Sequence, residues 1–347
     1  MRILHSADIH LDAPFAGRTV EEAAFLRREL LAVPGKLADI CVSRQCDMVL
    51  LAGDLFDGAY SRESYRALYT ALERMSVPVF VTPGNHDHCG MESPWEREVW
   101  PENVHIFKKE RLESVSVPRL DCRVYGAGYQ SMDCPGLLEN FATEGEEKYH
   151  VAILHADPTQ AVTPYCPVTK EQVRQSGLRY LALGHVHKTG SFQAGETLCA
   201  WPGCPMGRGY DETGEKGALI VELDDAVTAE FVALDTTRFY DLQAEQSGWK
   251  SLLPPAGSED FYRITLTGYS TGEKETAPSG FPYLELRDET VPEMDLWGSA
   301  GEDTLEGIYF GMLREAMEGK DESSQRCIRL AAQISRQILD GQEVKLP

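Results

Sequence analysis

The amino-acid sequence predicts an α/β protein with one large layered domain and one small second module. Over residues 1–235, short apolar segments of strand length alternate with segments of helical periodicity, which is the pattern of an α/β layered domain. The chain has 347 residues, enough for a large and a small domain with a substantial core. Its apolar and charged fractions, 42% and 25%, are those of an ordinary globular protein.

The elements of the large domain follow from this pattern. Ser61 is expected to start a helix, because apolar side chains recur at helical spacing as far as Met75. Another helix is expected over Val20–Arg44, with a break near Pro34-Gly35. Ten strands are predicted, at Arg2–His5, Met48–Ala52, Val77–Thr82, Val104–Phe107, Cys122–Gly126, His150–Leu154, Tyr180–Leu183, Thr197–Ala200, Ala218–Glu222 and Thr228–Leu234.

The character of the chain changes near Phe239. We therefore place the large domain at residues 1–238 and a small α/β module at residues 239–347. Residues 248–300 are rich in Gly, Pro and Ser, and two strands are predicted there, at Tyr262–Leu266 and Tyr283–Leu286.

Two amphipathic helices are predicted at the end of the chain, over residues 303–317 and 323–340. Packing of their apolar faces within this chain is the favoured interpretation, and docking of a partner is the alternative. The first face holds Leu305, Ile308, Tyr309, Met312 and Leu313, and the second holds Cys327, Leu330, Ala331, Ile334 and Ile338.

Cysteine usage and hydropathy predict a cytoplasmic protein. The nine cysteines are scattered and form no Cys-x-x-Cys pair, which argues against a zinc ribbon or a disulfide framework. No apolar run approaches the roughly 20 residues that a transmembrane helix needs, so no membrane contact is expected. The motif at Asp8 also leaves no room for a secretory leader.

The formal net charge of −22 opposes a simple nucleic-acid-binding role. A protein that grips nucleic acid by its phosphates usually shows a basic face. Both parts of this chain are acidic, and neither contains a long Lys/Arg run. A polyanionic substrate would therefore have to be attracted locally, chiefly by bound metal ions.

Five segments place metal-binding side chains directly after an apolar strand. In α/β sheets the loops at the carboxyl ends of strands converge on one crevice, so these segments are expected to meet. Mixed carboxylate, amide and imidazole ligands suit Mn²⁺, Fe²⁺ or Zn²⁺ better than Ca²⁺. The segments are Ser6–His10, Gly53–Asp57, Gly84–Asp87, Leu154-His155 and Gly184–His187.

In this order, the segments resemble the signature of the calcineurin-like metallophosphoesterase superfamily over residues 3–187. The resemblance implies a layered β-sandwich flanked by helices, followed by a small C-terminal α/β capping module. It also implies two divalent metal ions. Asp8, His10 and His187 resemble the ligands of one ion, Asn85, His155 and His185 those of the other, and Asp54 the carboxylate that bridges them.

The resemblance implies roles in catalysis as well. A hydroxide that bridges the two ions attacks phosphorus in line. His86 matches the histidine that assists the leaving group, and Asp57 the residue that orients His86. His88 follows the same motif and receives no role.

Other stretches resemble the bacterial SbcD/YhaO-like DNA-repair exonucleases. They are His5–Phe15, Trp201-Pro202-Gly203 with the glycine-rich Gly207–Gly217, and the C-terminal stretch from Glu302 to Gly341. Gly53–Ala59, in contrast, lacks the arginine that protein Ser/Thr phosphatases carry there. The expected function is therefore a two-metal DNA exonuclease of DNA repair, with Mn²⁺ as the expected ion and Fe²⁺ or Zn²⁺ as alternatives.

Substrate and partner contacts are also expected from position and resemblance. Arg18 and Arg208, with Arg62 and Lys188, lie near the motif loops and are candidates to contact phosphates, although a role as ordinary surface charges is an equal alternative. The expected partners are DNA and an SMC-like ABC ATPase docked by the C-terminal helices. Whether the chain forms a homodimer is left open by the sequence.

Two other functions remain as alternatives. The first is a phosphodiesterase or phosphatase that acts on a small or non-nucleic-acid phosphoester, which an acidic surface tolerates better. The second is a scaffold that has lost catalysis, which the complete set of seven ligands and His86 disfavours.

A first prediction concerns metal content. Because Asp54 is expected to serve two ions at once, the purified protein should bind close to two divalent transition ions per chain. Elemental analysis after reconstitution with Mn²⁺ and removal of loosely bound metal measures this ratio. A stoichiometry that stays at one ion would contradict the shared-carboxylate arrangement.

Overall fold

The computed structural model describes residues 1–255, 257–270 and 275–345. The chain forms two compact units, Met1–Phe239 and Tyr240–Pro347. The boundary between them lies one residue after the predicted one.

The first sheet of the N-terminal unit holds six strands in the order β12-β11-β1-β2-β3-β4. β1 to β4 are parallel, β11 pairs antiparallel with β1, and β12 pairs antiparallel with β11. β2 and β3 are nearly continuous apolar runs, as strands buried on both faces require, whereas β1 also buries the polar residues His5 and Ser6. The strands are β1 (Arg2–Ser6), β2 (Met48–Ala52), β3 (Val79–Thr82), β4 (Val104–Ile106), β11 (Gly217–Leu223) and β12 (Val227–Ala233).

The second sheet also holds six strands, in the order β5-β6-β7-β8-β10-β9. Its four inner strands are parallel, and an antiparallel strand closes each edge. β5 and β9 were not predicted from the sequence. The strands are β5 (Glu113–Val117), β6 (Cys122–Gly126), β7 (Tyr149–His155), β8 (Tyr180–Gly184), β9 (Gly190–Ala194) and β10 (Thr197–Trp201).

The two sheets pack face to face around one core. Leu50 and Phe80 from the first sheet and Val151 and Ile153 from the second belong to the same buried cluster. At about 25 cal/mol per Å² of buried apolar surface, this interface is a main source of the unit's stability. The predicted class, a layered α/β sandwich, is confirmed.

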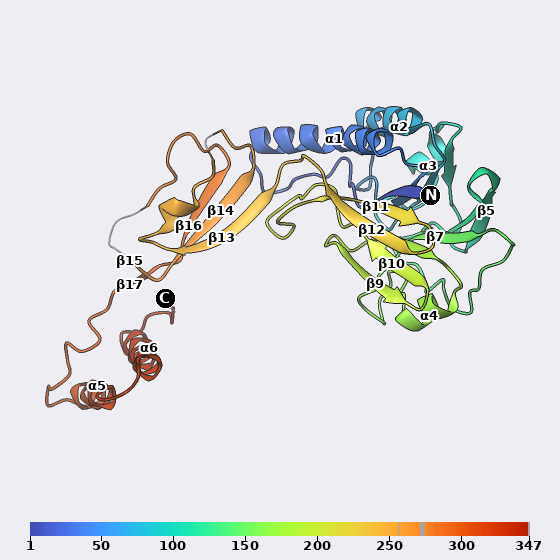
Figure 1. Ribbon diagram of the computed structural model, residues 1–347. Helices are drawn as coiled ribbons and strands as arrows, with labels where there is room; N and C mark the ends of the chain where they lie inside the picture. The colour runs from blue at the N-terminus through green and yellow to red at the C-terminus, as the bar shows by residue number, and fades with distance from the viewer. Residues whose placement is uncertain (256, 271–274, 346–347) are drawn as a thin grey trace. The chain divides into compact units, whose positions relative to one another are not determined.

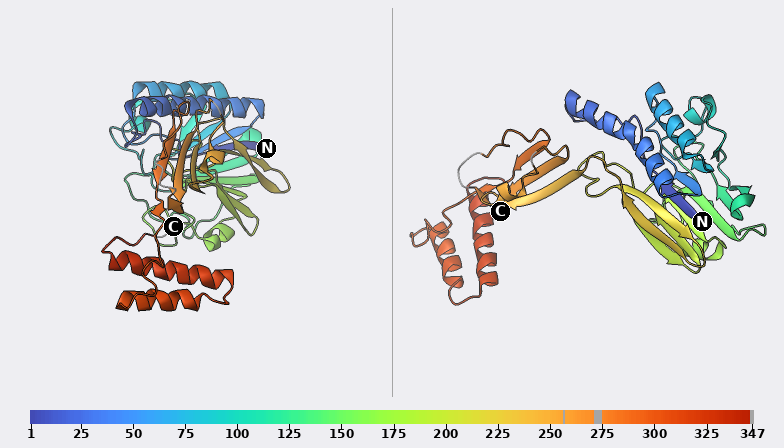
Figure 2. Two further views of the ribbon diagram at one scale, coloured as in Figure 1. Left: turned by 90° about the vertical axis from the view of Figure 1, so that its left-hand side faces the viewer. Right: turned by 45° about the horizontal axis from the view of Figure 1, so that its top comes forward.

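Helices cover both outer sides of the sandwich (Figures 1 and 2). α1 (Val20–Ser43) and α2 (Arg62–Met75) lie side by side along the sheet that contains β1 and β11. Ser61 caps α2, as predicted, and a capping box starts α1. Short α4 (Lys170–Gln175) packs near β9 and β10, and α3 (Pro94–Arg97) follows β3.

The break predicted at Pro34-Gly35 is wrong, because α1 continues through both residues. Proline removes one helical hydrogen bond and glycine is a poor helix former. Tertiary contacts offset that cost here. Val33, Pro34 and Leu37 are buried in the packed face of α1, and the Arg74 guanidinium of α2 donates a hydrogen bond to the Gly35 carbonyl at 2.6 Å.

The parallel strands bring the motif loops to one place. β1, β2 and β3 share one direction in the first sheet, and β7 and β8 share one direction in the second. The loops that follow these strands carry the candidate ligands, and a hydrogen bond from the Asp8 N–H to the Gly53 carbonyl links the first two loops. The carboxyl ends of five strands therefore build one site.

The C-terminal unit contains a three-stranded sheet in the order β13-β14-β16. Trp249, Ile264 and Leu266 form its small core. Its strands are β13 (Phe239–Glu245), β14 (Phe261–Thr267) and β16 (Leu284–Asp288), with a minor pair of β15 (Tyr269–Ser270) and β17 (Val291–Pro292). A 3₁₀ turn at Trp249–Leu252 follows β13, and the N-terminal unit has another at Pro118–Leu120.

Two helices, α5 (Leu305–Ala316) and α6 (Glu322–Leu339), end this unit. The predicted apolar face of α5 is not packed within the unit: Leu305, Ile308 and Met312 are 87%, 54% and 65% exposed. Phe310 is the large side chain of α5 that is buried, and α6 buries Ala332, Gln333 and Gln337 and leaves Ile338 exposed. Across the described residues, no helix combines the length and apolar character needed to cross a lipid bilayer.

Two glycine substitutions should have opposite effects on stability. A methyl group at Gly35 meets open space inside α1, so Gly35→Ala should raise the free energy of unfolding by about 0.5–1 kcal/mol. A methyl group at Gly184 would collide with the Ala52 carbonyl, so Gly184→Ala should lower it by about 1–3 kcal/mol. Urea unfolding of the three proteins measures both changes, and equal effects would contradict the packing described.

Candidate metal centre

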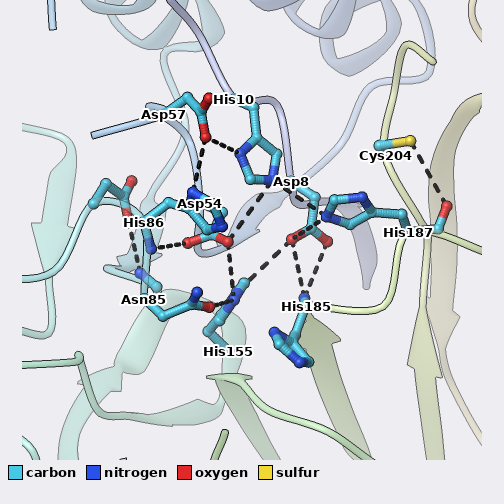
Figure 3. Close-up of polar contacts among 12 residues, drawn as sticks. Asp8, His10, Asp54, Asp57, Asn85, His86, His155, His185, His187 and Cys204 are labelled. Carbon is cyan, nitrogen blue, oxygen red and sulfur yellow. Dashed lines mark hydrogen bonds and ion pairs between the residues drawn. The ribbon is translucent and has the colours of Figure 1, made fainter. Parts of the chain in front are cut away.

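The structure brings the predicted ligands together between the two sheets (Figure 3). They come from the ends of five strands: Asp8 and His10 after β1, Asp54 after β2, Asn85 after β3, His155 at the end of β7, and His185 and His187 after β8. Asp8, His10, Asp54, Asn85 and His155 are buried. So many buried polar groups in one place require partners or ions.

Four of these residues have a left-handed backbone. Asp8, His10, Asp54 and His185 have φ angles of 53°, 52°, 51° and 85°, which side-chain-bearing residues seldom adopt. The Asp8 and His10 N–H groups donate hydrogen bonds to the carbonyls of Gly53 and Asp54, at 3.0 and 2.9 Å, and hold two of the turns in place. Such strain costs roughly 1–3 kcal/mol per residue and clusters at functional sites.

Glycine is required where the loops approach each other most closely. A Cβ on Gly53 would collide with the His155 ring, and one on Gly84 would collide with the Asp54 carboxylate. Gly53 also has a φ of 88°, which glycine adopts without cost. The glycines that precede the ligands therefore allow the side chains to gather.

One group of donor atoms consists of Asp8, His10 and His187. The Nε2 atoms of His10 and His187 lie 3.2 Å apart, and the His187 Nε2 lies 3.8 Å from an Asp8 carboxylate oxygen. These are the three residues that the family resemblance assigns to one ion.

A second group forms around His155. Its Nε2 lies 3.0 Å from the Asn85 side-chain oxygen and 3.3 Å from Oδ2 of Asp54. The same Asp54 oxygen lies 3.7 Å from the His10 Nε2 of the first group. Asp54 thus stands between the two groups, where a bridging carboxylate is expected.

The structure places His185 beside these groups rather than within them. Its backbone N–H donates to the Asp8 carboxylate at 3.0 Å. Its ring lies edge-on to His155, with 5.2 Å between ring centroids, and is 4.7 Å from the Tyr165 ring. Its assignment as a ligand stays a prediction.

Three imidazoles are oriented by acceptors at Nδ1. The His10 Nδ1 pairs with Asp57 at 3.1 Å, the His187 Nδ1 with Glu212 at 2.6 Å, and the His155 Nδ1 with the Ala52 carbonyl at 2.9 Å. An acceptor at Nδ1 fixes the proton there and leaves Nε2 as the metal-binding nitrogen. Nε2 is therefore the nitrogen that each of these three rings offers to a metal ion at the centre.

Asp57 holds two histidines at once. The same carboxylate oxygen lies 2.8 Å from the His86 Nδ1 and 3.1 Å from the His10 Nδ1. Hydrogen bonds from His10 and His86 hold the pKa of Asp57 well below its usual range. The bond to Asp57 in turn raises the pKa of His86 above its ordinary value, so His86 retains a proton more readily.

The electrostatics of the centre favour cations. Burial lowers the pKa of His155, but the charge of Asp54, its hydrogen bond and the charge of Asp8 outweigh burial and raise that pKa to about 10. Burial raises the pKa of Asp8 and lowers that of His10, because both groups lose water. The negative charges that favour a protonated imidazole also attract metal ions. The donor set therefore fits two divalent cations.

The turn that carries Asn85 and His86 is tied to its neighbours. The buried Asp87 carboxylate accepts the N–H groups of Gly84 and Leu55, at 2.7 and 2.8 Å. Burial, with the charge of Asp54, raises the pKa of Asp87 to about 7. The His88 Nδ1 lies 3.0 Å from the Asn85 carbonyl. These hydrogen bonds therefore hold the turn that carries His86 in one position.

The two candidate phosphate contacts lie in different surroundings. Arg208 reaches the centre, with Nη2 at 3.1 Å from the His187 Nδ1 and 2.9 Å from Glu212. The Arg18 guanidinium instead lies over the rings of Tyr210 and Phe239, 4.8 and 5.2 Å from their centroids.

Sequence reasoning missed Glu212 as part of the centre. It is 8% exposed, and it pairs with both His187 and Arg208. It lies in the glycine-rich stretch Gly207–Gly217, yet no spacing rule links it to a histidine 25 residues earlier. Tyr165, which contacts His185, carried no signal at all.

Comparison with known proteins identifies a family that this chain matches. Residues 1–189 match the family described as Calcineurin-like phosphoesterase. The uncharacterized metallophosphoesterase YhaO of Bacillus subtilis (strain 168) is 34% identical, over 93% of this chain and 88% of that protein. The D subunit of the nuclease SbcCD from the same organism is 25% identical, over 64% of this chain and 66% of that protein. A solved dimetal phosphatase from Danio rerio covers 67% of this chain and 96% of its own, at 12% identity and a TM-score of 0.43.

Replacement of Glu212 should weaken metal binding. Glu212→Gln removes the charged acceptor that orients His187, and loss of such an outer partner typically costs about 10–100-fold in metal affinity. Titration calorimetry with Mn²⁺ measures the change. Glu215→Gln, at an exposed neighbouring position, is the matched control and should bind like the unaltered protein. Equal affinity in both variants would show that Glu212 does not position His187.

Proposed function

Because this chain belongs to the calcineurin-like phosphoesterase family, we propose that it is a Mn²⁺-dependent DNA exonuclease of DNA repair. The phosphoester-hydrolase activity and the requirement for divalent metal ions come with the family and the donor clusters. The substrate, the metal and the biological setting are the proposal.

One observation supports a two-ion phosphodiesterase above all. A single Asp54 oxygen lies within 3.7 Å of the nitrogen donors of two groups, which is the position of a shared ligand. Asp8, His10 and His187 would hold one ion, and Asn85, His155 and His185 the other. When bound, the ions polarise a phosphoryl oxygen and favour ionisation of the attacking water.

His86 is suited to assist the leaving group. Its Nδ1 is held by Asp57 at 2.8 Å, and its side chain is 43% exposed, so a departing oxygen can reach the ring. The hydrogen bond to Asp57 raises the pKa of His86, which favours the protonated form that a leaving oxygen needs. Asp57 thus orients His86 and favours its charged form, and His86 donates to the leaving group.

DNA as the substrate is supported by similarity and opposed by charge. A relative at 25% identity is named a nuclease, and the further motifs resemble the same group. The net charge of −22 disfavours long-range attraction of DNA. Hydrolysis of a small phosphoester is therefore the second candidate, and the acidic surface is the observation that favours it.

A partner is proposed for the C-terminal unit. The exposed Leu305, Ile308 and Met312 form an apolar strip on α5 that suits a partner helix, in line with an SMC-like ABC ATPase. Self-association into a homodimer would bury the same strip. We place the protein in the cytoplasm, where its nine cysteines would stay reduced.

An activity panel tests the function. With Mn²⁺, the protein should release nucleotides from labelled single- or double-stranded DNA and hydrolyse bis-p-nitrophenyl phosphate. Asp54→Ala should lower both rates by at least about 10³-fold, and His86→Ala by about 10²–10⁴-fold, the usual range for a proton donor. Asp39→Ala, at an exposed position of α1, is the control and should keep full activity.

The panel also separates the alternatives. Hydrolysis of the small esters without any action on DNA would exclude the exonuclease and support the second candidate. No hydrolysis of any substrate by protein with two bound ions would support the scaffold.

A further inference from the structure

A cavity of about 600 Å³ lies beside His86. Ala59 and Tyr60 line it from the loop after β2, and Met91 and Pro94 from the segment after β3. His86 and His88 are on its wall. The volume lies within the roughly 300–1,000 Å³ of small-molecule sites.

His86 stands between this cavity and the metal centre. Its ring is 4.8 Å from the His10 ring, at a T-shaped angle, and it also lines the cavity. A phosphorus atom held at the centre would therefore have the cavity on the His86 side. That is the side from which the leaving oxygen departs if His86 assists it.

The walls of the cavity suit an uncharged ring rather than a phosphate. Ala59, Met91 and Pro94 are apolar, and the charge of Arg97 is balanced by an ion pair with Glu92. The Tyr60 hydroxyl donates to Glu98 at 2.9 Å, so its ring is held in place beside Phe56.

The far wall is preformed. Trp95 is buried, donates from Nε1 to the Asp87 carbonyl at 2.6 Å, and stacks on Trp100 with centroids 5.2 Å apart. These contacts fix the segment that carries Met91 and Pro94. The cavity therefore needs little ordering when a ligand binds, which favours affinity.

We infer that this cavity is the leaving-group subsite and that it takes a nucleoside, with its base and sugar held by apolar and stacking contacts. The inference rests on the proposed phosphodiesterase function. His88 contributes a polar contact: it lines the cavity, and because its Nδ1 pairs with the Asn85 carbonyl at 3.0 Å, Nε2 is the nitrogen that can meet a ligand. The subsite recognises the first unit of the leaving strand and not its phosphates.

Binding of thymidine to the metal-free protein tests the subsite without any turnover. Saturation-transfer NMR in EDTA should detect thymidine with the unaltered protein. Ala59→Trp fills the cavity from an exposed position and should weaken binding at least tenfold, as should Met91→Trp at a second lining position. Ala142→Trp, an exposed alanine outside the cavity, is the matched control and should bind normally. Thermal melts confirm that all variants fold.

Kinetics with Mn²⁺ then link the subsite to the leaving group. Ala59→Trp should lower kcat/KM at least tenfold for dithymidine phosphate, whose leaving group is a nucleoside. It should lower release of methanol from the methyl ester of thymidine 5′-phosphate no more than twofold.

Each outcome has a distinct meaning. Equal loss for the two esters, or unchanged binding and kinetics in both tryptophan variants, would overturn the subsite while leaving the phosphodiesterase intact. Thymidine binding that the variants abolish, without hydrolysis of either ester, would overturn the proposed function and the leaving-group role together.

Discussion

The Asp54 carboxylate joins the loops on which the centre depends. Its Oδ2 lies near His155 from one sheet and His10 from the other, and its Oδ1 accepts the His86 N–H at 2.9 Å. Its own carbonyl accepts the His10 N–H. One residue at the end of β2 thus connects the loops after β1, β3 and β7, and the two sheets must pack as they do for it to make these contacts.

The cost of this crowding is visible in the backbone. Asp8, His10 and Asp54 all have positive φ angles, and glycines occupy the points where a Cβ would collide. An array of strained, buried, charged groups is unfavourable in itself. The large apolar core between the sheets offsets that cost, and metal ions would neutralise the charge that the array concentrates. Stability and metal binding are therefore coupled in this unit.

The acidity of the chain and its chemistry are compatible because they act over different distances. At physiological salt, charges more than about 8 Å apart are largely screened, so the net charge of −22 affects encounter more than the bound state. At the centre, cations and the His86 proton would govern the phosphate. The neighbouring cavity has apolar walls and a balanced ion pair. Binding of a ligand there therefore does not depend on the surface charge.

The sequence by itself determined the layered α/β class, the two-part organisation and the residues that cluster after β1, β2, β3, β7 and β8, because strand periodicity and ligand-type side chains are local signals. It did not reveal the edge strands β5 and β9, which are partly exposed and carry no apolar run, or the continuity of α1 through Pro34, which packing against α2 sustains. Nor did it reveal that Glu212 orients His187, that Asp57 serves both His10 and His86, or that the apolar strip of α5 is exposed. Only the tertiary structure decided these, because each depends on which distant segments the fold brings into contact.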